Sequence, residues 1–231
     1  QLRGEILSFI PVEKNVEVML VTITNTGRMA QTVTPTAAIP LYGRSADNIR
    51  DHRHVTSLLH RIETTDIGVL VTPTLSFDER GHQVNHMTYY CVGWSGNGEK
   101  PVDFYPTAED FVGEGGNFER PYAIVKNAEG VKAGTRIEGL EAVGGLHFSE
   151  VTLEPEEECS YLIFTGITED IQEIRNLSKT YTTREMVLEE LEKTKAYWQE
   201  KVNVAYHTGD SDFNQFMHWV SFQPILRRIY G

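Results

Sequence analysis

The stretch VEVMLVTIT at residues 16–24, followed at once by Asn25-Thr26-Gly27, decides the fold class of this chain. Apolar and polar side chains alternate along it, and most of its residues are β-branched, which is the pattern of a half-buried β-strand. The Asn-Thr-Gly sequence is typical of a turn. The stretch therefore predicts a strand that ends in a turn.

Further runs of the same kind fill the first three quarters of the chain. They lie at residues 68–73, 88–94, 146–153 and 161–166, with most of the glycines between them. Short strands that follow one another without helices are typical of an antiparallel sandwich or barrel. We therefore predict a mainly β, antiparallel sandwich domain over residues 1–170.

The apolar period changes in the last quarter. Thr182 and Glu185 fit a capping box, and the apolar positions that follow recur at helical spacing as far as Trp198. This pattern predicts an α-helical linker over residues 171–208.

A second helix is predicted in the C-terminal segment, residues 209–231. It should start after residues 210–212, where acidic and hydroxyl side chains precede a run of aromatic residues. It should end or kink at Pro224, because proline has no amide hydrogen to donate.

The composition excludes several classes of partner. The 231 residues hold 21 Lys and Arg against 33 Asp and Glu, a formal net charge of −12. Binding of nucleic acid or of an anionic lipid surface needs a basic face, and no apolar run approaches the ~20 residues that span a bilayer. We expect a cytoplasmic protein in which Cys91 and Cys159 are free thiols. A single disulfide between these two cysteines is the alternative that the sequence leaves undecided.

The densest polar cluster is RDHRH at residues 50–54, followed by His60-Arg61. His52 and His54 would share a face of a strand and could bind a metal, but no third ligand follows at a fixed spacing, so we expect no metal site. Arg53 could instead offer its fork of donors to an anion or to sugar hydroxyls. A buried ion pair made by Asp51 explains the cluster equally well, and the residues alone leave these two readings open.

No complete active site follows from spacing alone. No pair of carboxylates is fixed as an acid and base, and no nucleophile elbow, phosphate loop or zinc pattern is present. Trp94, Tyr89 and Tyr105 are aromatic candidates for stacking on sugar rings, although for a β domain we expect most of them in the core. We therefore name no catalytic residue within this chain.

Longer stretches of the sequence resemble a known family. Residues 46–57 (ADNIRDHRHVTS) and 21–27 (VTITNTG) resemble the N-terminal β-sandwich of glycoside hydrolase family 94, the inverting phosphorylases of β-linked glucans and of chitobiose. Residues 4–11 (GEILSFIP) resemble the strand before these motifs, and residues 219–231 (WVSFQPILRRIYG) resemble the opening of the family's barrel. The resemblance implies an antiparallel super-β-sandwich, an α-helical linker and the start of an (α/α)6 barrel.

The resemblance also implies a reaction. Inorganic phosphate, as co-substrate, attacks the anomeric carbon of a β-glucoside, while an Asp of the barrel protonates the leaving oxygen and an α-sugar 1-phosphate is formed; no cofactor is required. By this resemblance the chain is a piece of a larger enzyme. The piece is expected to lack the front of the sandwich and the catalytic part of the barrel. Its expected partners are a β-linked oligosaccharide, phosphate, the rest of the barrel and a second subunit in a homodimer.

One binding site is carried over from the resemblance. In the disaccharide phosphorylases of the family, a Gln-Arg pair on a sandwich loop reaches the active site of the adjacent subunit, and the matching positions here are His52 and Arg53. The arginine agrees, whereas histidine replaces glutamine. We therefore expect Arg53, then His52, then His54 to bind substrate. The sequences of residues 51–54 and 222–224 resemble those of the family branch that acts on β-1,2-linked oligoglucans.

Two other functions compete with this one. A carbohydrate-binding module without catalysis would use the aromatic residues named above, but it has no need for the apolar segment at 213–230. A hydrolase with a similar layout, like the relatives of maltose phosphorylase and trehalase, shares the architecture without sharing the chemistry. The sequence of residues 50–57 argues against such a hydrolase.

Overall fold

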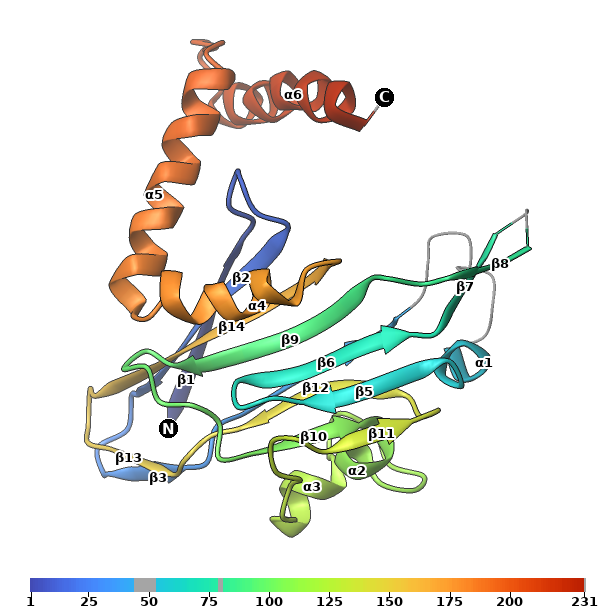
Figure 1. Ribbon diagram of the computed structural model, residues 1–231. Coiled ribbons are helices and arrows are strands. Elements are labelled where there is room, and N and C mark those ends of the chain that lie inside the picture. Colours follow the sequence, from blue (N-terminus) through green and yellow to red (C-terminus); the bar gives the residue numbers. More distant parts are fainter. Residues whose placement is uncertain (44–52, 79–80, 231) are drawn as a thin grey trace. The chain divides into compact units, whose positions relative to one another are not determined.

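The computed structural model describes residues 1–43, 53–78 and 81–230 (Figure 1). The chain divides into two compact units, Gln1–Val187 and Leu188–Gly231. In the described part of the chain, all the strands belong to the first unit.

A seven-stranded antiparallel sheet forms the larger layer of the first unit. Its strands, in spatial order, are β1 (Leu2–Phe9), β2 (Val16–Asn25), β14 (Glu158–Thr168), β9 (Thr88–Ser95), β6 (Gly68–Pro73), β5 (His60–Thr64) and β11 (Arg136–Glu138). The stretch at 16–24 is the body of β2, which pairs with β1 on one side and with β14 on the other. Strand β1 is exposed along nearly its whole length, and Ile6 is 69% exposed.

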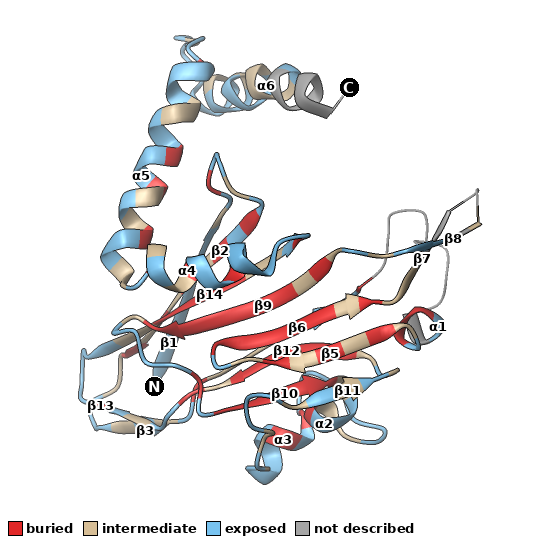
Figure 2. Ribbon diagram, viewed as in Figure 1, coloured by how far each residue is buried: buried red, intermediate tan, exposed pale blue. Residues whose placement is uncertain are grey.

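A smaller sheet packs against the middle of the large one. It consists of β10 (Asp103–Thr107), β12 (Ala142–His147) and β4 (Thr36–Leu41), with β12 in the centre and facing β6 and β9. Val69, Cys91, Leu146 and Ile163 are buried between the two layers, and Figure 2 shows these central strands almost entirely buried. The antiparallel sandwich predicted from the sequence is confirmed.

Two small ribbons complete the strands. Strand β3 (Gln31–Val33) pairs with β13 (Val151–Leu153), and β7 (Leu75–Asp78) pairs with β8 (Gly81–Val84). The prediction of one strand over residues 146–153 is therefore wrong in part. These residues form the end of β12 and the whole of β13, with a break between them. Phe148 between them turns into the core, where its ring lies 4.6 Å from that of Tyr161.

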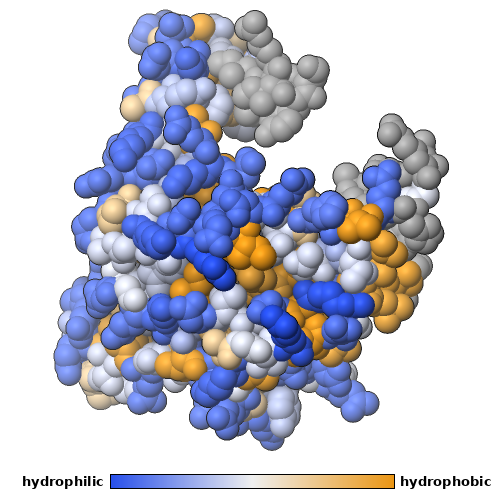
Figure 3. All heavy atoms as spheres, in the orientation of Figure 1, coloured by the Kyte–Doolittle hydropathy of each residue, from blue (hydrophilic) through white to orange (hydrophobic). Residues whose placement is uncertain are grey.

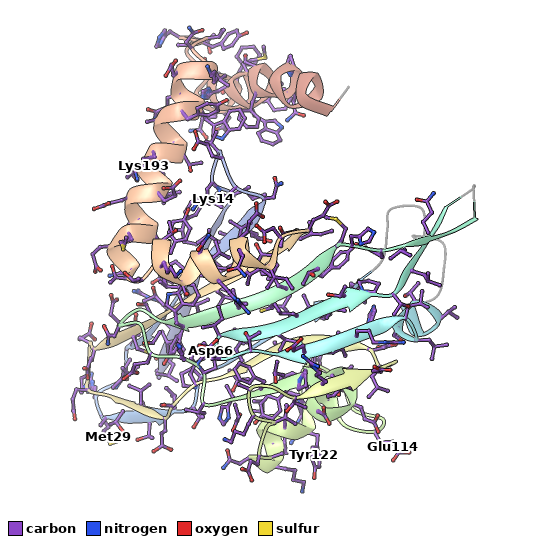
Figure 4. All side chains as sticks on the ribbon, viewed as in Figure 1. Lys14, Met29, Asp66, Glu114, Tyr122 and Lys193 are labelled. Carbon is purple, nitrogen blue, oxygen red and sulfur yellow. The ribbon has the colours of Figure 1, made fainter. Side chains whose placement is uncertain are left out.

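Three short helices lie in the connections: α1 (Arg53–Ser57), α2 (Ala108–Val112) and α3 (Tyr122–Lys126). Thr107 begins α2 as its N-cap, since its hydroxyl accepts a hydrogen bond from the Asp110 amide at 3.1 Å and donates to the Asp110 carboxylate at 2.7 Å. The glycine-rich connection joins α2 to α3; Glu114 and Tyr122, labelled in Figure 4, are exposed there.

Two longer helices follow the last strand. Helix α4 (Ile171–Thr180) is capped by Asp170 and packs on β14 and β9. Helix α5 (Arg184–Lys201) begins one residue later than predicted, because the Thr183 carbonyl accepts its first bond from the Val187 amide. Hydrogen bonds from its own amide and from the Thr183 hydroxyl lower the pKa of the Glu185 carboxyl. Thr183 is therefore the residue before the helix, Met186 occupies the third helical position, and the predicted capping box of Thr182 and Glu185 is wrong.

An aromatic stack fastens the end of α4 to the sheet. Tyr181 lies 5.5 Å from Phe164, which in turn stacks 4.7 Å from Trp94. The Trp94 indole donates a 2.7 Å hydrogen bond to the Tyr181 carbonyl. Lys14, labelled in Figure 4, places its Nζ 4.7 Å from the centre of the Tyr181 ring.

The second unit contains most of α5 and helix α6 (Ser211–Tyr230). Asp210 is the N-cap of α6 and accepts hydrogen bonds from the Asp212 and Phe213 amides, each at 3.0 Å. Of the two outcomes predicted at Pro224, an end or a kink, the end is wrong, because α6 continues to Tyr230. Within this unit, Trp198 on α5 packs its ring 4.3 Å from that of Phe222.

Both cysteines are free thiols, as expected. Cys91 on β9 is paired with Thr165 on β14, six positions along the strand from Cys159. At ~3.3 Å per residue, that offset places the two cysteines far beyond the reach of a disulfide. Among the described residues, no helix combines the length and apolar character needed to cross a membrane.

Candidate functional site

Two of the three predicted substrate-binding residues, Arg53 and His54, lie at the start of helix α1. His52 lies outside the described residues, and for Arg53 and His54 only the backbone is described, in the first turn of α1. Residues two apart on a helix point in widely different directions, whereas on a strand they share a face. The strand geometry on which the metal reading of His52 and His54 depended therefore does not apply to His54.

Helix α1 has one anchored side and one open side. Thr56 and Ser57 are buried, the Leu59 amide donates to the Thr56 carbonyl at 3.1 Å, and the Thr74 amide donates to the Leu59 carbonyl at 3.0 Å. Val55 in the helix and Leu58 in the turn just after it face outward, at 48% and 65% exposed. Figure 3 shows hydrophobic surface gathered over this helix. Arg53 therefore begins an element that is tied to the sandwich and presents an apolar side to solvent.

His60, the first residue of β5, lies directly behind this helix and is 3% exposed. Its Nδ1 lies 3.1 Å from the Leu140 carbonyl oxygen, so Nδ1 carries the hydrogen and donates. Its Nε2 is buried and faces the backbone of Gly43, with no hydrogen bond of standard geometry among the described residues. Burial lowers the pKa of His60, while the backbones of Leu140 and Gly43 and the charge of Glu141 oppose that shift. His60 is thus a neutral, buried acceptor at ordinary pH.

A small cavity of about 20 Å³ lies beside the His60 ring. Tyr42, Ser57, Phe118 and Glu141 contribute to its wall. This volume holds about one water molecule and no larger ligand. The next residue, Arg61, is on the outer side of the strand, where it pairs with Glu138 at 3.4 Å. Such an exposed pair contributes little to stability.

A second histidine site was not predicted from the sequence. His147 on β12 donates from Nδ1 to the Asp103 carboxylate on β10 at 2.6 Å, and their side chains are 16% and 7% exposed. Lys132 lies 3.8 Å from the other carboxylate oxygen. The two residues are 44 positions apart and meet only because β10 and β12 pair in register. Nothing in their spacing could have revealed the contact.

A larger cavity of about 430 Å³ lies between the β9–β10 turn and the start of β14. Its wall includes several carboxylates, but the charges that face each other are paired: Arg184 lies 3.3 Å from Glu158, and Lys100 pairs with Asp66. The aromatic rings beneath it, Phe148 and Tyr161, are buried and pack on each other. The cavity therefore offers no exposed aromatic platform.

The aromatic candidates for sugar stacking are mostly in the core, as expected. Trp94 and Tyr105 are buried, and Tyr89 is half-buried. The Tyr105 hydroxyl donates to the Ala128 carbonyl at 2.7 Å. Across the side chains that the structure describes, no group of three or more His, Cys, Asp or Glu residues is arranged to hold a metal ion.

Comparison with known families gives a clear result once this geometry is known. Residues 1–184 match the family described as Glycosyl hydrolase 94, supersandwich domain. The chain belongs to this family. The match covers every described strand and helix α4, and it ends at the first residue of α5. No curated protein matches the chain.

Membership of glycosyl hydrolase family 94 identifies which domain of that family the sandwich is. The two layers described above are a supersandwich domain from a family of glycoside phosphorylases. Helix α1, His60 and the aromatic stack on Tyr181 all lie inside the matched region.

Proposed function

We propose that this chain is the sandwich and linker portion of an inverting phosphorylase that cleaves β-glucosides, of the β-1,2-oligoglucan or cellobiose type, with inorganic phosphate to give α-glucose 1-phosphate. The observation that carries the proposal is the family match over residues 1–184. The catalytic acid is supplied by an (α/α)6 barrel of which α6 is the first helix. The sandwich itself is structural and lends substrate-binding residues to a neighbouring subunit in a cytoplasmic homodimer.

Arg53 is the leading binding residue in this proposal. A guanidinium group presents several donors in a fixed plane, which suits the hydroxyl pairs of a sugar or a charged ligand. Two features support the role: the buried side of α1 fixes the helix on the sandwich, and the exposed Val55 and, just after the helix, Leu58 offer apolar surface for contact with another subunit. His52 and His54 flank Arg53 and complete the proposed site.

The alternative of a purely carbohydrate-binding module finds less support. A sugar-binding sandwich of that kind needs exposed aromatic rings for stacking. Trp94 and Tyr105, two of the three candidates, are buried. The polar cavity beside Arg184 offers no exposed ring either, since Phe148 and Tyr161 are buried beneath it.

The test uses the full-length enzyme that contains this domain. Incubation with β-1,2-linked and β-1,4-linked oligoglucans should release glucose 1-phosphate only when inorganic phosphate is added, with inversion at the anomeric carbon detected by NMR. Release of free glucose at the same rate without phosphate would identify a hydrolase and overturn the proposal.

The binding role is tested by substitution of Arg53 in the same enzyme. Arg53→Ala should raise KM for the oligosaccharide about tenfold or more, as the loss of a charged hydrogen bond predicts. Arg136→Ala is the matched control, because Arg136 is an exposed arginine on β11 that pairs with Glu63. Equal kinetics for the two variants would remove Arg53 from the site.

A further inference from the structure

Gly43 and the start of helix α1 are the described residues that flank segment 44–52 in the chain. Gly43 and Ser57 of α1 both lie beside one buried residue, His60. The chain reaches Gly43 from β4, and the description resumes at Arg53. A Cβ at Gly43 would lie 2.9 Å from Pro73 Cγ, 3.1 Å from Val71 Cγ1 and 3.2 Å from His60 Nε2. The backbone at Gly43 therefore lies flat on the end of β6 and on the His60 ring, where no side chain fits.

The returning chain is held close to the same ring. Ser57, the last residue of α1, lines the 20 Å³ cavity beside His60. The Leu59 amide then closes the turn on Thr56, and Thr74 binds the Leu59 carbonyl. A helix of five residues has no stability of its own. The direction of α1 must therefore come from these contacts.

His60 connects three backbone segments through one ring. Nδ1 holds the Leu140 carbonyl before β12, Nε2 faces Gly43, and the cavity beside the ring reaches Ser57. The Gly43 backbone is held against Nε2 without a well-formed hydrogen bond, and such burial of a ring nitrogen costs free energy. The cavity is large enough for one water molecule that could donate to Nε2. Tyr42 and Glu141 are the titratable groups that line it in the described part of the chain.

We propose that His60 is a positioning residue, which fixes α1 against Gly43 and Leu140 and thereby sets the position of Arg53, the first residue of that helix. The proposal rests on the proposed function in one respect, the binding role of Arg53. The hold of His60 on α1 stands on the geometry alone. His60 touches no substrate in this scheme, and its effect is on KM and not on the chemical step.

Two amide substitutions in the full-length enzyme separate the nitrogens of the ring. In His60→Asn the amide nitrogen can replace Nδ1 and keep the Leu140 bond, whereas in His60→Gln the longer side chain can reach the Nε2 position. Each variant should speed hydrogen exchange of the Leu59 amide about fivefold or more, because each removes one of the two contacts of the ring, to Gly43 in His60→Asn and to Leu140 in His60→Gln. Each should raise the oligosaccharide KM by a similar factor with kcat within about twofold.

His147→Asn is the matched control. His147 is also a largely buried histidine bound through Nδ1, but it lies between β10 and β12 and binds Asp103. This variant should leave the Leu59 amide and KM unchanged. Gly43→Ala approaches the same contact from the opposite side, since its Cβ meets Nε2, and it should reproduce the His60 variants.

The outcomes are distinct. Unchanged Leu59 exchange in both His60 variants and in Gly43→Ala would overturn the inference, and so would a uniform increase across β6 and β9, which shows loss of the core alone. Faster Leu59 exchange with an unchanged KM would support the hold of His60 on α1 and overturn the binding role of Arg53. Both effects together, absent from His147→Asn, would support the whole scheme.

Discussion

At the scale of single residues, His60 predicts how the sandwich responds to acid. Burial lowers the pKa of His60 below its ordinary 6.5, so in mild acid the unfolded chain binds a proton that the folded chain does not. The contribution of His60 is present above pH 6.5 and is lost as the pH falls towards the folded-state pKa. The free energy of unfolding should therefore fall between pH 7 and pH 5.

Urea titrations of the wild type and of His60→Gln at several pH values measure this effect. The variant should show a shallower pH dependence, because glutamine does not titrate, while the other histidines contribute equally to both proteins. Parallel pH curves would show that His60 is not neutral in the folded state.

The two thiols should differ in reactivity with a disulfide reagent at pH 8. Burial raises the pKa of Cys91 to about 12, and Cys159, half-buried beside Glu157 and Glu158, also has a raised pKa. Since the thiolate is the reactive form, the native protein should react slowly at Cys159 and not at Cys91. In denaturant both Cys91 and Cys159 should react rapidly. Cys159→Ser should abolish the native reaction, and a rapid reaction of two native thiols would contradict the buried position of Cys91.

At the scale of elements, the aromatic stack decides how firmly the linker is attached to the sheet. Tyr181 is 1% exposed and packs on Phe164. Tyr181→Ala should lower the free energy of unfolding by about 3–5 kcal/mol, the usual cost of removing a large buried ring. Tyr181→Phe keeps the ring and should cost much less. Urea unfolding followed by circular dichroism measures both, and equal losses would show that the ring contact is not the source of stability.

The cap of helix α2 offers a second, smaller test. Thr107→Ala removes the acceptor for the Asp110 amide and should cost about 0.5–2 kcal/mol. Thr107→Ser retains the hydroxyl and serves as the control. Thermal melts of the two variants should differ, and coincident melts would show that the cap contributes nothing measurable.

The elements also show how far a sequence can be read. Alternation over β2 and β6 predicted those strands closely, because each buries at least one face and the side-chain period of a strand is two. Helices α2 and α3 were not predicted, since five residues are too few to show a helical period. The signal that could have found α2 is Thr107-x-x-Asp110, a cap followed by an acidic residue.

The candidate site was predictable only in part. The cluster at 50–54 with His60 stands out by composition, and its binding role stays a prediction. The buried position of His60, its bond to Leu140 and the pairing of Asp103 with His147 depend on strand register between distant segments. No local pattern carries that information.

At the scale of the whole molecule, the second unit predicts that one substitution will act differently in two contexts. Phe216 on α6 is 61% exposed. If α6 begins a barrel, Phe216→Glu should be nearly neutral for the 231-residue chain and should lower the melting temperature of the full-length enzyme by several degrees, because a buried charge is costly. Gln215→Glu is the control, since Gln215 is also exposed on α6. Equal effects of Phe216→Glu in both proteins would count against a barrel around α6.

The exposed strand β1 has a practical consequence for solubility. Among the described strands β1 pairs only with β2, and it carries exposed apolar residues that include Ile6. An open, apolar edge strand is a template for edge-to-edge aggregation, and a lysine on such an edge blocks it. Ile6→Lys is therefore the replacement to choose for keeping the isolated chain monodisperse at the concentrations that crystallisation requires.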